Sequence, residues 1–163
     1  MLIGPKNNQV DFDRIIYADK NGDLEVLGQT TLMIRNIPIK FSQADMMALI
    51  NVQFENHYNY FYLPKDLKTQ CGVGFAFIKM TDAIYILDFF LEFNGIKWSE
   101  KVEKCNSNKY CEITYANVQG LDEIKLELSD KNIMKKTEGS IKPQFFEDRK
   151  ADQEEIKQIL HEY

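Results

Sequence analysis

A chain of 163 residues with 44% hydrophobic and 12% aromatic residues can bury one sizeable core, which excludes a disordered polypeptide. No run approaches the roughly eighteen apolar residues of a membrane span, and the first residues lack a signal peptide's apolar centre. We therefore expect a soluble intracellular protein, nuclear or cytoplasmic or both, and no membrane partner. The net charge of −5 argues against a protein that holds nucleic acid through charge alone.

Cysteine and histidine are too sparse and too scattered to predict a metal site. The three cysteines include no CxxC pair, and His57 and His161 stand far apart, whereas a structural zinc ion needs four close ligands. The sequence also has no Gly-rich phosphate loop and no serine, histidine and aspartate in a catalytic order. We expect no metal, no cofactor and no enzymatic activity.

Composition and element pattern divide the chain into three regions. Residues 1–29 form an N-terminal extension, 30–118 a central domain, and 119–163 a C-terminal extension with one or two helices. In the first region, two short apolar runs flank Asn21 and Gly22, which predicts a β-hairpin. The central domain has nine basic and nine acidic residues, so the acidic surplus lies in the two extensions.

The first half of the central domain predicts a strand, a helix and a second strand. An aliphatic run at residues 31–37 predicts the first strand. Ser42 suits the N-cap of the following helix, with Asp45 at its N3 position, and apolar residues at helical spacing continue that helix to about residue 54. Residues 58–63 are mostly aromatic and predict the second strand.

The second half of the central domain repeats this alternation. A polar loop at residues 65–72 precedes a third strand at 73–80, and Thr81 is expected to cap a strongly apolar helix that ends at Asn94-Gly95. Residues 110–116 predict a fourth strand. The order βαββαβ predicts an α+β, ferredoxin-like fold in which two helices cover one face of a four-stranded antiparallel sheet and leave the other face open.

The C-terminal extension predicts two helices separated by an irregular segment. Residues 121–128 predict a helix with Leu121, Ile124, Lys125 and Leu128 on one side. Residues 129–150 are loop-like apart from an apolar island at 143–146, and residues 151–161 predict a charged last helix. Either extension is long enough to cover the open sheet face or to bind a partner.

Period-two alternation predicts an aromatic platform on the open sheet face. It places Phe75, Phe77 and Lys79 on one side of the third strand, and Ala76 and Ile78 on the other. Two neighbouring rings on an outward face form a surface on which unpaired bases stack. The pattern therefore predicts that single-stranded nucleic acid binds at Phe75 and Phe77, whereas the alternative for both rings is burial under a terminal helix or a protein partner.

The segments at residues 32–37 and 73–80 resemble the paired signature hexamer and octamer of an RNA-recognition motif. In combination with other segments, the chain resembles the C-terminal RNA-recognition motif of the Mei-two-like family, RNA-binding regulators of fungal meiosis and plant development. The resemblance implies single-stranded RNA binding by an extended domain, as a ribonucleoprotein component or RNA regulator. It runs from about Thr30 to Phe146 and is carried by Met33 to Pro38, Tyr62-Leu63-Pro64 with Asp66 and Lys68, Cys71 with Val73 to Ile78, Phe93-Asn94-Gly95 with Lys97-Trp98, Tyr115-Ala116 with Gln119-Gly120, and Pro143 to Phe146.

Two positions depart from the general pattern of RNA-recognition motifs. Met33 stands where most of these motifs stack an aromatic ring, and Val73 replaces the basic first residue of the octamer. Methionine at the first position is also typical of the Mei-two-like branch, and it offers a polarizable contact with weaker stacking than a ring.

Further candidate RNA-binding residues lie on the first three strands. Arg35 and Lys79 project from the platform face and either contact phosphates and base edges or remain solvated charges. Tyr58, Tyr60 and Tyr62 are expected to share one side of the second strand. Tyr60 and Tyr62 either extend the platform or pack in the core or at the sheet edge.

The fourth strand and one loop supply the remaining candidates. Glu112 and Thr114 are expected to face outward; Thr114 and Asn117 are candidates for hydrogen bonds to a base, and Glu112 opposes phosphate. Lys65 and Lys68 precede the octamer and either clamp an RNA backbone or are ordinary loop lysines. We interpret Trp98, by contrast, as a packing residue.

Two functions from different classes remain. The leading hypothesis is a single-stranded RNA-binding module without catalytic activity. The alternative is an RNA-recognition-motif fold reused as a protein-interaction or assembly subunit with weak or no RNA binding, which the acidic balance, Met33 and the long extensions favour. An open sheet face around Phe75 and Phe77 favours RNA binding, and a covered one favours assembly or autoinhibition.

Overall fold

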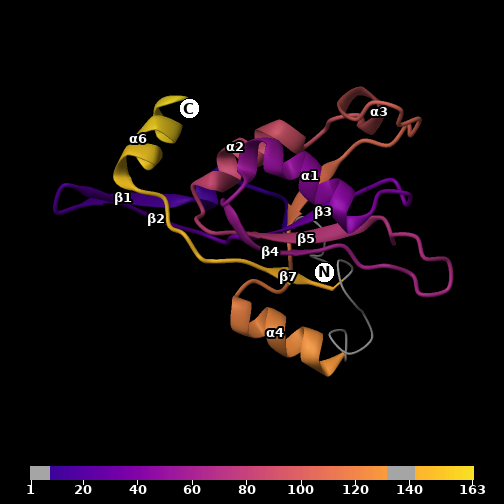
Figure 1. Ribbon diagram of the computed structural model, residues 1–163. Coiled ribbons are helices and arrows are strands. Elements are labelled where there is room, and N and C mark those ends of the chain that lie inside the picture. The colour runs from indigo at the N-terminus through magenta and orange to yellow at the C-terminus, as the bar shows by residue number, and fades with distance from the viewer. Residues whose placement is uncertain (1–7, 132–141) are drawn as a thin grey trace, which may run out of the picture.

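The computed structural model describes residues 8–131 and 142–163, and its centre is an antiparallel five-stranded sheet (Figure 1). Helices α1 (Gln43–Phe54) and α2 (Tyr85–Phe93) cover one face, and α4 (Leu121–Asp130) lies against the other. The predicted ferredoxin-like α+β fold is thus confirmed. The strand order is β6-β3-β5-β4-β7, with β3 (Thr31–Arg35), β4 (Tyr58–Tyr62), β5 (Phe75–Met80), β6 (Glu112–Tyr115) and β7 (Gln144–Phe145).

The fifth strand, β7, was not predicted. It is two residues long, too short for a period-two pattern, and it pairs Phe145 with Tyr60 at the free edge of β4. The middle of the apolar island at residues 143–146 therefore forms an edge strand rather than part of a loop. Residues 132–141 of the loop predicted over 129–150 lie outside the described residues, as do residues 1–7 of the N-terminal extension.

One hydrophobic core fills the space between the sheet and helices α1 and α2. Strict alternation contributes core residues from β3, β5 and β6, because every second side chain of these strands points toward the helices. The short helix α3 (Trp98–Lys101) adds Trp98, which is completely buried and meets the edge of Phe41 at a centroid distance of 5.6 Å. The interpretation of Trp98 as a packing residue is confirmed. The strand residues of this core are Leu32, Ile34, Tyr58, Phe61, Ala76, Ile78, Met80, Ile113 and Tyr115.

Helix α1 begins at the predicted cap, and this cap gives a testable stability effect. The hydroxyl of Ser42 accepts from the Asp45 backbone N–H at 3.0 Å, and the Asp45 carboxylate accepts from the Ser42 backbone N–H at 2.9 Å. Ser42→Ala should therefore lower the free energy of unfolding by about 1 kcal/mol in urea denaturation. Ser42→Thr keeps the hydroxyl and should stay close to the parent. Equal midpoints for the alanine and threonine variants would contradict this role.

Helix α2 starts three residues after the position that the sequence suggested. Thr81 does not cap it: the Thr81 hydroxyl donates to the His57 carbonyl at 3.3 Å, and α2 begins at Tyr85 without a side-chain cap. Asp82 instead accepts from the Ile84 backbone N–H at 3.1 Å and so supports the turn before the helix. The predicted end is correct, since Asn94 closes α2 and Gly95 follows with φ of +82°.

The predicted N-terminal hairpin and the predicted last helix are both present, and they contact each other. Strands β1 (Ile16–Lys20) and β2 (Asp23–Leu27) form the hairpin, with positive φ at both Asn21 and Gly22. Helix α6 (Gln153–His161) lies beside this hairpin (Figure 1). The Gln153 side chain accepts from the Leu24 backbone N–H at 2.7 Å and donates to the Leu24 carbonyl at 2.9 Å, as a paired strand would.

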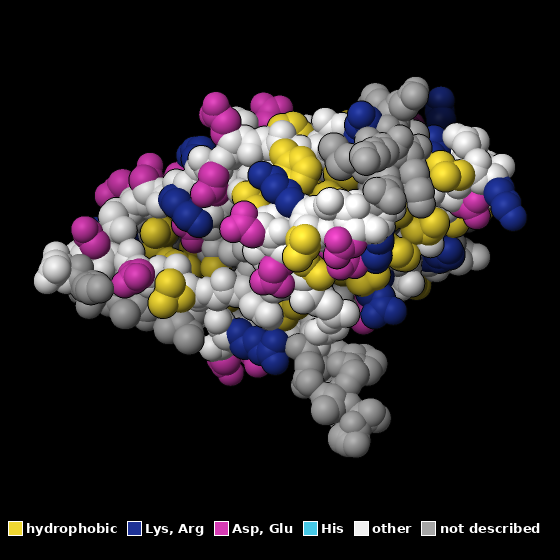
Figure 2. All heavy atoms as spheres, turned by 90° about the horizontal axis from the view of Figure 1, so that it is seen from below, with side chains coloured by type: hydrophobic (Ala, Val, Ile, Leu, Met, Phe, Trp, Pro, Cys, Tyr) yellow, Lys and Arg dark blue, Asp and Glu magenta, His cyan; other side chains and the backbone are white. Residues whose placement is uncertain are grey.

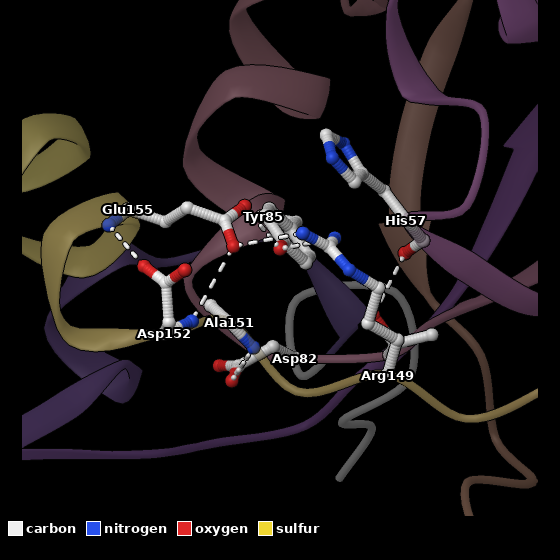
Figure 3. Close-up of polar contacts among 8 residues, drawn as sticks. His57, Asp82, Tyr85, Arg149, Ala151, Asp152 and Glu155 are labelled. Carbon is white, nitrogen blue, oxygen red and sulfur yellow. Dashed lines mark hydrogen bonds and ion pairs between the residues drawn. The ribbon is translucent and has the colours of Figure 1, made fainter.

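A polar cluster attaches the start of α6 to α2 (Figure 3). The Tyr85 hydroxyl donates to the Glu155 carboxylate at 2.7 Å, and Arg149 donates to the same carboxylate at 2.9 Å. The His57 ring stacks on Tyr85 with centroids 4.2 Å apart. Burial, followed by the bond to Glu155, raises the pKa of Tyr85. The last helix is therefore fastened on the helix side of the sheet. Within the two described stretches, no helix combines the length and apolarity needed to cross a membrane.

Candidate nucleic-acid interface on the outer sheet face

The outer face of the sheet, opposite α1 and α2, arranges its side chains in rows across the strands. One row comprises Thr114, Met33, Phe77 and Tyr62, each opposite the next in the strand register. Adjacent strands lie about 4.8 Å apart, so this row is about 14 Å long. The outer face therefore carries a line of apolar and aromatic groups at its centre, with Met33 in direct register with Phe77.

Phe75 and Phe77 lie next to each other on β5, as alternation predicted. Their ring centroids are 5.6 Å apart with an interplanar angle of 73°, an edge-to-face pair. Both side chains are half-buried, so part of each ring remains exposed. In the neighbouring row Arg35 stands opposite Phe75 and Glu112 opposite Arg35. The aromatic pair is thus bordered by one cation and one carboxylate.

Helix α4 covers the part of the outer face that β4 and β7 form. Ile124 and Leu128, one turn apart, pack against Tyr60 and Tyr62, which are only 3% and 7% exposed. The Lys125 ammonium lies 5.4 Å from the ring centroid of Phe145, within cation–π range. Burial raises the pKa of both tyrosines. Tyr60 and Tyr62 are therefore packed under a helix rather than displayed as an open extension of the platform.

The expectation that Tyr58 shares a side with Tyr60 and Tyr62 is wrong. Tyr58 stands opposite Met80 but Tyr60 stands opposite Lys79, so one extra residue is inserted between them. This bulge reverses the alternation, and the Tyr58 ring enters the helix-side core, where its hydroxyl donates to Asn51 at 2.6 Å. Only two of the three tyrosines can therefore belong to the outer face.

The predicted cations of the outer face differ in their surroundings. The Arg35 guanidinium lies 4.0 Å from the Glu112 carboxylate, and both side chains are nearly half exposed, at 45% and 48%. Lys79 is half-buried, and burial followed by the Lys150 charge lowers its pKa. The Asp148 carboxylate opposes that shift. Arg35 is therefore the accessible cation beside the aromatic pair, and Lys79 lies against the C-terminal segment.

Thr114 is not an accessible base-binding residue. It faces outward as predicted but is only 5% exposed, because it forms a β-bridge with Gln9 from the N-terminal segment. Asn117 is exposed, and its side-chain oxygen accepts from the Asn8 amide at 2.9 Å. The N-terminal segment therefore covers the β6 edge of the face, while Asn117 stays at the surface beside it.

The loop before β5 holds Lys65 and Lys68 in different environments. Lys65 is half-buried and bridges to Gly72 across the loop, and Lys68 is exposed. The Asp66 carboxylate accepts from the Lys68 backbone N–H at 2.8 Å and orders the turn between them. Neither lysine lines the hollow that the outer face forms with α4. The structure does not bring these lysines together with the aromatic pair.

A hollow of about 460 Å³ lies between the outer face and α4. Met33, Phe75 and Phe77 contribute from the sheet, and Ile124 and Leu128 from the helix. The sequence predicted the apolar side of α4 but not the surface on which that side packs. The spacing of Ile124 and Leu128 signalled that the helix needs an apolar surface, and the outer face supplies it.

Charges of both signs are mixed on the side of the molecule that carries α4. Figure 2 looks onto this side and shows aspartate and glutamate side chains interspersed with lysine and arginine. A mixed surface attracts phosphate only weakly, because nonspecific affinity for nucleic acid depends on clustered cations. Any nucleic acid that binds here must gain its affinity mainly from the apolar and aromatic groups.

The chain is similar to a defined protein family. The profile of the family described as RNA recognition motif 2 matches residues 29–129. Protein MEI2-like 4 of Oryza sativa subsp. japonica is 37% identical over 129 residues, which cover 79% of this chain and 12% of that protein. Protein MEI2-like 5 of the same organism is 43% identical over 112 residues, covering 69% and 12%. The chain thus spans about an eighth of the length of these relatives.

Among solved structures, the chain is similar to one described as the Rna15 RRM with bound RNA. The two are 15% identical with a TM-score of 0.45, over 61% of this chain and 96% of that one. The family assignment rests on the sequence match, which covers more than half of the chain and includes both signature segments. The chain belongs to the RNA recognition motif 2 family, the family found in MEI2-like proteins.

Proposed function

We propose that the chain is a single-stranded RNA-binding module that stacks bases on Phe75 and Phe77. The observation that carries the proposal is the pair of adjacent, partly exposed rings on the outer face of β5. Every base has a flat π-face, so such rings bind single strands with little sequence preference, at about 1–3 kcal/mol per base. Membership of a family described by RNA recognition supports the same function.

The footprint on the sheet is short. Helix α4 occupies the side of Tyr60 and Tyr62, and the N-terminal segment occupies the side of Thr114. Between them stand Met33, Arg35 and the aromatic pair, enough for two or three nucleotides, the usual number for this kind of sheet. Met33 supplies an apolar contact to a base, and Arg35 is the residue that meets a phosphate or a base edge.

Chemical-shift mapping tests this proposal directly. When a short single-stranded RNA of mixed sequence is added to isotope-labelled protein, the backbone amide signals of β3 and β5 should shift, including those of Met33, Arg35, Phe75 and Phe77. Signals from α1 and α2, on the other side of the sheet, should stay in place. Shifts confined to α1 and α2 would contradict the proposed surface.

The Glu112 carboxylate should limit the affinity for RNA. It pairs with Arg35 and adds a negative charge where a phosphate would approach. Glu112→Gln should therefore tighten RNA binding about two- to fivefold, the equivalent of about 0.4–1 kcal/mol for an exposed pair. Fluorescence anisotropy at fixed salt measures the change. Glu154→Gln, an equal change of charge on exposed α6, is the matched control and should leave binding unaltered.

A second function has its own supporting observation. Because α4 buries Tyr60 and Tyr62 and the surrounding charges are mixed, the fold could serve as a protein-interaction or assembly subunit with weak or no RNA binding. In the mapping experiment, an absence of shifts in β3 and β5 at millimolar RNA would favour this alternative. Shifts there at micromolar RNA would favour the RNA-binding module.

A further inference from the structure

We infer that the hollow between α4 and the outer sheet face is a binding slot for one unpaired nucleobase. The inference rests on the proposed function and assigns a role to α4 that the aromatic pair alone does not require. The slot receives a base from the same single strand that stacks on Phe75 and Phe77, and α4 forms its second wall.

The size of the hollow is that of a ligand site. Well-packed protein interiors leave few voids larger than a water molecule, whereas small-molecule pockets measure about 300–1,000 Å³. The hollow measures about 460 Å³. This volume lies within the range of small-molecule pockets, and it suits a flat base with part of its ribose.

The two walls are chemically suited to the two faces of a base. Phe77 and Met33 lie in register on the sheet side, where a π-face can stack on the ring and contact the polarizable thioether. Ile124 and Leu128 form the opposite wall from α4. A base between these walls removes apolar surface from water on both sides, which gives a stronger contact than stacking on an open sheet.

The helix wall is anchored rather than loosely placed. The apolar side of α4 packs on Tyr60 and Tyr62, and Lys125 lies over the Phe145 ring. Its start is tied to β3, because the Gln119 side chain accepts from the backbone N–H groups of Thr30 and Thr31 at 3.1 and 2.9 Å. A wall anchored at its start and along its length keeps the slot formed before a ligand arrives.

The rim offers polar groups that suit the edge of a base. Glu127 and Lys131 both line the hollow and form an ion pair at 2.7 Å, so their charges balance at the rim. Asn117 stands at the edge of the hollow with its side-chain oxygen already held by Asn8, which orients the amide toward donation. A carboxylate and an amide match the donors and acceptors on base edges.

The slot is continuous with the aromatic pair. Phe75 and Phe77 line the hollow as well as the exposed surface of β5, so consecutive nucleotides can stack on one ring and enter beside the other. This continuity identifies the occupant as part of a single strand rather than a free small molecule.

Filling the slot tests the inference. Ala116 lines the hollow, and Ala116→Phe places a ring in the space that a base would take. Leu126→Phe, on the side of α4 where Leu126 is 63% exposed, adds the same kind of bulk away from the slot. In anisotropy titrations with a labelled single-stranded RNA of about six nucleotides, Ala116→Phe should weaken binding about tenfold, the contribution of one stacked base. Leu126→Phe should match the parent. Val118→Phe fills the same hollow from another position if Ala116→Phe does not fold.

A series of RNAs with one abasic nucleotide identifies the inserted base. For the parent protein, an abasic nucleotide at one position should weaken binding about tenfold. In Ala116→Phe, an abasic nucleotide at that same position should cause no further loss of affinity, because the substitution and the missing base remove the same contact.

If Ala116→Phe and Val118→Phe both bind RNA as the parent does, while binding still requires Phe75 and Phe77, the slot is wrong and the proposed function stands. Tighter binding by the filled variants would make α4 a cover that blocks the sheet, which also overturns the slot. If the parent itself does not bind the RNA, the proposed function and the slot both fail.

Discussion

Replacing both Phe75 and Phe77 with alanine is expected to weaken binding of a short single-stranded RNA at least about thirtyfold. Each ring contributes about 1–3 kcal/mol of stacking, and two such losses correspond to that factor or more. The loss should be severe because the outer face offers few other sources of affinity: Arg35 is near Glu112, and Lys79 is half-buried. Anisotropy titration of parent and variant with the same RNA gives the ratio.

The matched control removes a ring elsewhere. Phe146 is 45% exposed and contacts Tyr58 on the helix-core side rather than the aromatic pair, so Phe146→Ala should bind RNA as the parent does. Circular dichroism melting of all three proteins separates lost binding from lost folding. A folded double variant that binds as tightly as the parent would remove the aromatic platform from the mechanism.

Salt dependence distinguishes stacking from charge as the source of affinity. A protein that contacts few phosphates shows only a shallow fall of the logarithm of the binding constant with the logarithm of salt concentration. Among the described residues, Arg35 is the accessible cation in register with the rings, Lys131 at the rim of the hollow is paired with Glu127, and the charges around them are mixed. Because few phosphates are contacted, we expect a large loss of affinity in the double alanine variant and only a small loss of affinity when salt is added.

Sequence alternation predicted the outer face wherever the strand ladder is unbroken. Phe75 and Phe77 lie where period two places them, because β5 pairs without interruption with β3. Tyr58 does not, because the bulge before Tyr60 adds one residue and reverses the faces. A bulge depends on how two strands pair, and the local pattern of aromatic residues at 58–62 does not predict it.

The composition of the candidate site was less predictable than the fold. The apolar side of α4 was visible from Ile124 and Leu128, but several apolar surfaces compete for such a helix, and local spacing does not select Tyr60 and Tyr62. Thr114 was assigned to the correct face, yet a segment from the far end of the chain covers it through Gln9. Long-range packing, rather than strand periodicity, therefore decides which outer-face residues stay accessible.

Gln119→Ala is expected to lower the free energy of unfolding by about 2–4 kcal/mol, since it removes four hydrogen bonds worth about 0.5–1.5 kcal/mol each and leaves backbone groups unpaired. The Gln119 side-chain oxygen accepts from the backbone N–H groups of Thr30 and Thr31, and its amide donates to the carbonyls of Thr31 and Ala116 at 2.9 and 2.7 Å. One side chain thus joins the start of β3 to the end of β6, immediately before α4. Urea denaturation followed by circular dichroism measures the loss.

The glutamate variant tests the donating half of this contact. Gln119→Glu keeps an oxygen for Thr30 and Thr31 but turns a second oxygen toward the carbonyls of Thr31 and Ala116, so at neutral pH its stability should fall at least as far as that of the alanine variant. Because Gln119 joins the residues just before α4 to β3, RNA binding should weaken in the same order at temperatures where all three proteins are folded. Gln119→Ala with parent-like stability would show that α4 is positioned by its contacts with Tyr60 and Tyr62 alone.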